Sequence, residues 1–100
     1  MAGGALIARI AASTLRRRGV SWTPGTTLEG QAQEAAAAAV GLLRSCAGND
    51  ALPLEEGEDF DLAVVACWYL MEGRRAEFLR EYADELLYLR LRETLDDGSE

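Results

Sequence analysis

Histidine and lysine are absent from this chain of 100 residues, so arginine supplies all ten of its cationic side chains. Without histidine, the chain lacks the commonest general base and metal ligand, and no Ser–His or Cys–His arrangement can form. Without lysine, it lacks a Schiff-base nucleophile and the cation of a phosphate-binding loop. We therefore expect that the protein is not an enzyme, with no catalytic residues and no cofactor.

Cysteine is scarce as well, and neither of the two cysteines belongs to a CxxC pair. Cys46 and Cys67 each lie in an apolar stretch with helical spacing, which favours two buried free thiols over a disulfide. The segment Glu56-Gly57-Glu58-Asp59 does not have the alternating carboxylates of a calcium-binding loop. The sequence therefore predicts no bound metal.

Long apolar runs are missing too, since none approaches the ~20 residues that a membrane-spanning helix requires. Residues 2–15 are weakly apolar, but Arg9 interrupts them and a cluster of arginines follows them instead of preceding them. This order is not that of a signal peptide. We expect no membrane partner and a protein that is cytosolic or is assembled in the cytoplasm.

The residues that are abundant predict an all-α fold. Hydrophobic residues make up 49% of the chain and charged residues 27%, and alanine and leucine, which favour helix, dominate the apolar set. This length and composition predict one compact helical domain over residues 1–95, with a short mobile acidic tail over 96–100. The apolar spacing predicts four helices, over about residues 4–18, 27–46, 60–72 and 74–95.

Local signals define the second helix most clearly. Thr26 and Glu29 form a capping box at its start, and Gly48 provides a left-handed end. Its alanine run, Ala35–Ala39, has no bulk on any face, which favours close packing with another helix or with a neighbouring subunit. The third helix is apolar nearly all round, so we expect it to be central. The predicted core consists of Phe60, Leu62, Val65, Trp68, Phe78, Tyr82, Leu86 and Leu89.

Charge is divided unevenly along the chain, whose net charge is −7. Residues 1–50 carry five arginines and three carboxylates, a net charge of +2, whereas residues 51–100 carry five arginines and fourteen carboxylates, a net charge of −9. The acidic half opposes tight binding to a phosphate backbone. The two halves offer complementary surfaces for head-to-tail contact between copies.

Two sets of residues are candidates for interfaces. The first set is a candidate for contact with a partner protein or a neighbouring subunit. It consists of arginines and one loop tryptophan: Arg16, Arg17, Arg18, Trp22, Arg74 and Arg75. The arginines could instead end a helix, and the Arg74-Arg75 pair could form salt bridges with the acidic segment 55–61. The second set is acidic and could face a channel or an interface, or be solvated surface: Glu55, Glu56, Glu58 and Asp59.

The pattern of the C-terminal half resembles a known family. Residues 60–70 form an apolar helix with a central Trp-Tyr pair, and residues 76–90 contain an aromatic residue before a Tyr-x-x-Glu-Leu-x-x-Leu segment. Gly30-Gln31 and Ala47-Gly48 add two smaller features. Over about residues 28–92, the chain resembles the head–tail connector, or adaptor, proteins of siphophage-type tailed phages, which are small α-helical proteins that dock beneath the portal.

The resemblance implies a structural virion protein at the neck between head and tail. Its partners would be about twelve copies of itself in a ring, the portal protein, and the next connector or a tail-completion protein. Such a ring extends the DNA channel, and DNA passes through it without specific binding. A mobile acidic tail could order on contact with the portal or the next ring.

Two other functions use the same features. A small acidic helical regulator, such as an antitoxin-like protein, would mask a basic partner by the same charge asymmetry. A helix-turn-helix DNA binder would use the first two helices around Pro24-Gly25, but that connection is longer than the usual three or four residues. The net charge of −7 also opposes DNA binding.

Overall fold

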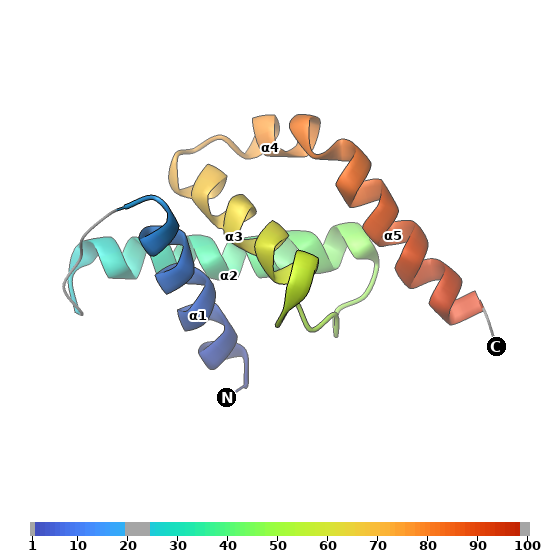
Figure 1. The fold of residues 1–100 in the computed structure, drawn as a ribbon, viewed down its shortest axis with the longest axis horizontal. Helices are drawn as coiled ribbons and strands as arrows, with labels where there is room; N and C mark the ends of the chain where they lie inside the picture. Colours follow the sequence, from blue (N-terminus) through green and yellow to red (C-terminus); the bar gives the residue numbers. More distant parts are fainter. Residues whose placement is uncertain (1, 20–24, 99–100) are drawn as a thin grey trace.

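The computed structural model describes residues 2–19 and 25–98, and this part of the chain is helical, with no strand among the described residues. The all-α prediction is therefore confirmed, although the described part contains five helices where four were expected. Their bounds are α1 Ala2–Arg17, α2 Thr27–Ala47, α3 Gly57–Met71, α4 Arg75–Glu81 and α5 Ala83–Gly98. Figure 1 shows α2 running behind α1 and α3, while α5 extends away from them towards the C-terminus.

The predicted signals at both ends of α2 are confirmed. The Thr26 side chain accepts a hydrogen bond from the backbone N–H of Glu29 at 3.5 Å. The Glu29 carboxylate in turn accepts one from the N–H of Gly25 at 2.7 Å, one residue before the expected position. At the other end, Gly48 has a φ of 71° and donates its N–H to the Ser45 carbonyl, which stops the helix.

Helix α2 occupies the centre of the fold, because α1, α3 and α5 all pack against it. Its face towards the core consists of small side chains, and Ala32, Ala36 and Ala39 are completely buried. The thiol of Cys67 on α3 donates to the Ala32 carbonyl oxygen at 3.6 Å, so a side chain of one helix reaches the backbone of the other. The expectation of close packing at the alanine run is confirmed. Helix α3 also packs against three helices, α1, α2 and α4, so it shares the central position with α2.

Two buried features were not predicted. Thr14 on α1 is fully buried, and its hydroxyl lies 2.8 Å from the Ile10 carbonyl oxygen and 3.4 Å from that of Val64, which joins α1 to α3. In the loop between α2 and α3, Leu52 and Leu54 are buried with the helical core. The loop is therefore attached to the core by its two leucines.

The single helix predicted over residues 74–95 is in fact two helices, because Tyr82 has a non-helical backbone conformation with φ −110° and ψ 22°. Its ring stacks on Phe78 at 5.1 Å, and Tyr69 of α3 lies edge-on to both rings. This aromatic cluster holds α4 against α3 and lets α5 turn towards α2. The tail predicted over 96–100 also differs, because α5 extends as a helix to Gly98, and residues 99–100 lie outside the described residues.

The predicted core residues differ in their burial. Phe78, Leu86 and Leu89 are buried, while Phe60, Leu62, Val65 and Tyr82 are partly buried and pack against the core. Trp68 does not belong to the core cluster: it is half-buried, and the Arg18 guanidinium covers its ring at 4.7 Å. The prediction for Trp68 is corrected because the side of α3 that meets α2 consists of the smaller residues Ala63, Ala66 and Cys67.

Enlarging the alanine face of α2 should destabilise the fold. Ala36→Leu places an isobutyl group where the helices already touch, so we expect its free energy of unfolding to fall by about 1–3 kcal/mol. Ala37→Leu is the matched control, since Ala37 lies one residue away and is exposed. We expect that variant to stay within about 0.5 kcal/mol of the parent. Denaturant unfolding measures the stability of both variants. Equal midpoints would contradict the close packing of the alanine face of α2 against α3, which we call the seam.

Candidate functional site

A groove with a volume of about 440 Å³ lies between α3 and α5. Both helices pack on neighbouring elements, but they do not pack on each other. The floor and walls are apolar or aromatic, from Leu62 and Val65 on α3 to Leu89 on α5, with Tyr82 at the turn that precedes it. The remaining lining residues are Tyr88 and a charged rim: Glu58, Asp59, Asp61, Asp84, Glu85 and Arg92.

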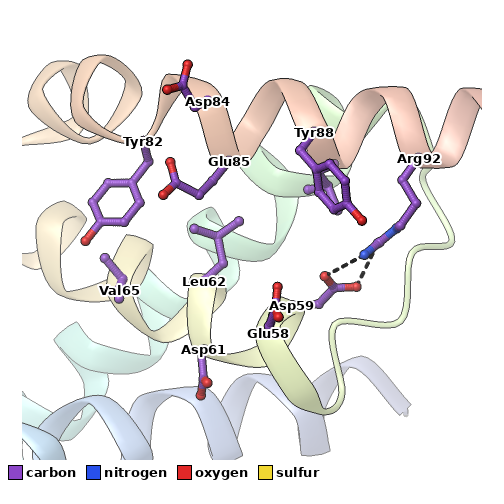
Figure 2. A pocket seen from close by; sticks show the side chains of 11 residues that line it. Glu58, Asp59, Asp61, Leu62, Val65, Tyr82, Asp84, Glu85, Tyr88 and Arg92 are labelled. Carbon is purple, nitrogen blue, oxygen red and sulfur yellow. Dashed lines mark hydrogen bonds and ion pairs between the residues drawn. The ribbon is translucent and has the colours of Figure 1, made fainter.

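The groove follows from the directions in which α3 and α5 bury their side chains. Helix α5 buries Leu86 and Leu89, and it packs against α2. Helix α3 directs its small residues into the seam with α2, which leaves Leu62 and Val65 on its other side. Figure 2 shows these two side chains opposite Tyr82 and Glu85, which point from the turn and from α5 towards α3.

One end of the groove is closed by ion pairs. The Arg92 guanidinium donates two hydrogen bonds to the Asp59 carboxylate, at 2.9 and 3.1 Å, and also bonds to Glu93 at 3.0 Å (Figure 2). These bonds, with the one to Asp59 the largest, raise the pKa of Arg92 above its ordinary value. Glu93 also accepts a hydrogen bond from the Asn49 side chain at 2.8 Å. Helix α5 is therefore tied to the start of α3 and to the loop after α2.

The other end of the groove adjoins the aromatic cluster of Tyr69, Phe78 and Tyr82. The Tyr69 hydroxyl donates to the Glu81 carboxylate at 2.6 Å, a bond that raises the pKa of Tyr69. The Arg74 guanidinium lies 4.6 Å from the centre of the Tyr69 ring. Both ends of the groove are thus held by contacts between α3 and the C-terminal helices.

The expected salt bridges between Arg74-Arg75 and residues 55–61 do not form among the described residues. Arg74 instead pairs with Glu72 and Glu77, each at 2.8 Å, because these carboxylates lie within one helical turn of it. The hydrogen bond from Arg74 lowers the pKa of Glu77. Arg75 is exposed.

The arginines that reach the acidic segment come from α1 and α5. Arg17 pairs with Asp61 at 2.8 Å, and Arg9 donates to the Glu55 carbonyl oxygen at 2.9 Å while it covers the Phe60 ring at 4.8 Å. With Arg18 on Trp68, two of the three clustered arginines contact α3 of their own chain, and Arg16 is exposed. The predicted interface residue Trp22 lies outside the described residues.

The four acidic candidates do not behave alike. Glu55, Glu56 and Glu58 are exposed, and each remains a candidate for an interface. Asp59 is half-buried, and its carboxylate is held by Arg92. The structure therefore separates Asp59, which stabilises the fold, from three carboxylates that face solvent in the single chain.

An apolar surface on α5 escaped the sequence prediction. Leu87, Tyr88 and Leu91 are 56%, 64% and 50% exposed, although large apolar side chains on a helix of this size usually face a core. Tyr88 lines the groove, and Leu87 and Leu91 are exposed on the same helix outside the groove lining. The sequence contained an indication of this surface, because leucines lie on more than one face of α5 and α2 can cover only one face.

Within the two described ranges, no group of three His, Cys, Asp or Glu side chains is placed to hold a metal ion. Burial raises the pKa of the Cys67 thiol, which disfavours the reactive thiolate. None of the described helices has the length and apolarity needed to cross a membrane.

Removing the Arg92 side chain should loosen α5 while the core stays folded. Arg92→Gln loses the two-bond contact with Asp59, a pair partly shielded from solvent, so we expect a local loss of about 1 kcal/mol. That loss corresponds to about fivefold faster amide exchange along residues 86–94. Hydrogen exchange followed by NMR measures this rate residue by residue.

The matched control is Arg17→Gln, which removes the ion pair with Asp61. Both of those side chains are about half exposed, at 49% and 57%, so the pair contributes little. We expect no change of exchange in α5 for this variant. Equally faster amide exchange of α5 in both variants, or unchanged exchange in Arg92→Gln, would contradict our inference that the Arg92 contact holds α5 in place.

Comparisons with known proteins give no family for this chain. No family model, no curated protein and no solved structure matches it. The resemblance to phage connectors therefore depends on the residues quoted above, and their function enters as a proposal.

Proposed function

We propose that this protein is a structural subunit of a phage neck, a head–tail connector that docks beneath the portal as part of a ring. The observation that carries the proposal is the groove between α3 and α5, together with the exposed Leu87, Tyr88 and Leu91. Exposed apolar side chains beside a groove with a charged rim are typical of a contact with another protein. The residues on which the family resemblance depends, 60–70 and 76–90, supply most of this surface, including Leu62, Val65 and Tyr88.

The proposed ring requires two different faces of each subunit to meet. Exposed arginines such as Arg16 and Arg75 lie on α1 and α4, whereas Glu34 on α2 and Asp50 in the loop after it are exposed carboxylates outside the groove. Opposite charges on different faces favour head-to-tail contact, which closes into a ring when the rotation allows it. About twelve copies, assembled in the host cytoplasm, would then extend the DNA channel of the virion.

Other parts of the proposal follow from charge and composition. The portal and the next connector or tail-completion protein are the proposed partners, and DNA passes without specific binding because the net charge of −7 opposes contact with phosphates. No catalytic role and no cofactor are proposed. Exposed Glu55 and Glu56 are the carboxylates best placed to face a channel without losing an internal contact.

The second candidate is a small acidic regulator that masks a basic partner. The acidic rim of the groove favours it, since Glu58 and Glu85 flank an apolar floor in the single chain. Such a protein would act at low copy number in the cell and would not be a component of the particle. Copy number therefore separates the two functions.

Mass spectrometry of purified virions whose genome encodes this chain tests the proposal. We expect peptides of the chain at a copy number close to that of the portal protein, because a ring beneath the portal has a similar number of subunits. The major capsid protein, counted in the same digest, is the control for quantification. Absence of the chain from mature virions would contradict the connector function and favour the regulator.

A further inference from the structure

We infer that the groove between α3 and α5 binds an amphipathic helix of a partner protein, whose apolar stripe is flanked by arginine or lysine. This inference deepens the proposed connector function and rests on it for the identity of the partner. Helices often bind in grooves of this kind by anchors at i, i+3, i+4 and i+7. The lining residues run from Glu58 to Val65 on α3 and from Asp84 to Arg92 on α5, which gives walls about 10–12 Å long, enough for about two turns of an occupant.

The floor of the groove offers contacts for large apolar anchors. Leu62 and Val65 are partly buried, so part of each side chain is available to a ligand. Tyr88 is 64% exposed and stands over the groove near the Arg92–Asp59 pair (Figure 2). Tyrosine is enriched at the energetic centres of protein interfaces, because its rigid ring gives a large contact area.

The rim determines the charge of the occupant. Glu58 on α3 and Glu85 on α5 lie on opposite walls, and neither has an ion pair within the described ranges. Asp59 and Asp61 are already paired with arginines of the same chain, and Asp84 points away from α3 in Figure 2. A helix with a cation on each flank would pair with both free carboxylates while its apolar stripe covers the floor.

A second copy of the chain fits the groove less well. Its α5 carries apolar residues, but it also carries Asp84 and Glu85, which would face the same carboxylates. Its α1 has too little apolar volume, because its exposed face includes Ala5 and Ala8, whose side chains are too small to fill the floor of the groove. Charge and volume together therefore favour a different protein.

The walls of the groove are fixed before any partner arrives. The Arg92–Asp59 pair holds the two helices at one end, and the stacked Phe78 and Tyr82 hold the turn at the other. A groove that is already open avoids the free-energy cost of reorganisation on binding. Arg92→Gln should thus weaken binding without removing any apolar contact.

Three synthetic peptides of about 18 residues test the inference by calorimetry with the full chain. The first has leucines at helical spacing with flanking arginines, the second has the same composition in scrambled order, and the third has glutamate in place of arginine. We expect the first to bind at least about tenfold more tightly than the others, a difference of about 1.4 kcal/mol. Amide shifts should change in residues 58–65 and 82–92.

Variants of the chain, each with a matched control, locate the site. Tyr88→Ala and Glu85→Arg should each weaken binding of the first peptide about tenfold. Gln33→Ala truncates an exposed uncharged side chain on α2 away from the groove, and Glu34→Arg makes the same charge change on that helix. Both controls should bind as the parent does. Equal loss in variants and controls, or equal binding of the scrambled peptide, would overturn the inference.

Other outcomes separate this inference from the proposed function. Self-association of the parent chain that Tyr88→Ala abolishes would assign the groove to a second copy and overturn the inference. Specific peptide binding by a chain that is absent from virions would support the groove and overturn the connector function. A chain present at the portal's copy number that shows no preference among the peptides would overturn the inference alone.

Discussion

The close contact of α2 with its neighbours determines most of the structure. Because Ala32, Ala36 and Ala39 have no bulk, α3 approaches until the Cys67 thiol meets the Ala32 carbonyl. The part of α3 that fits this seam consists of small residues, so its larger apolar residues remain on the opposite side. The groove is therefore a consequence of the seam: a close-packed interior on one side of α3 leaves Leu62 and Val65 for a partner on the other.

Arginine adds polar contacts between helices that also share the apolar core. Arg17 and Arg18 tie α1 to α3, and Arg92 ties α5 to the start of α3. Part of the charge difference between the two halves of the chain is thus satisfied inside the single molecule. The carboxylates that remain, such as Glu58 and Glu85, surround the groove, and they give it a charge preference that an apolar surface alone would not have.

Local chemistry made much of the fold predictable. The capping box at Thr26 and the left-handed Gly48 identified the ends of α2 correctly, and the alanine run identified where another helix packs closely against it. The break at Tyr82 was not predictable, because no proline or glycine marks it and it depends on rings that meet only in the folded chain. Periodicity also could not separate buried Leu86 from exposed Leu87, since the two are adjacent leucines and only the position of α2 distinguishes them. For the same reason the groove was missed, although several of its residues were singled out.

Hydrogen exchange of the chain in an isolated portal–neck complex, compared with the free chain, tests the account most directly. A helix seated in the groove would suppress local opening of both walls. We predict that the largest gain in protection falls in residues 57–71 and 83–94, with Tyr88→Ala reducing it. Protection gained only in α1 and α2, with the walls of the groove unchanged, would contradict the account.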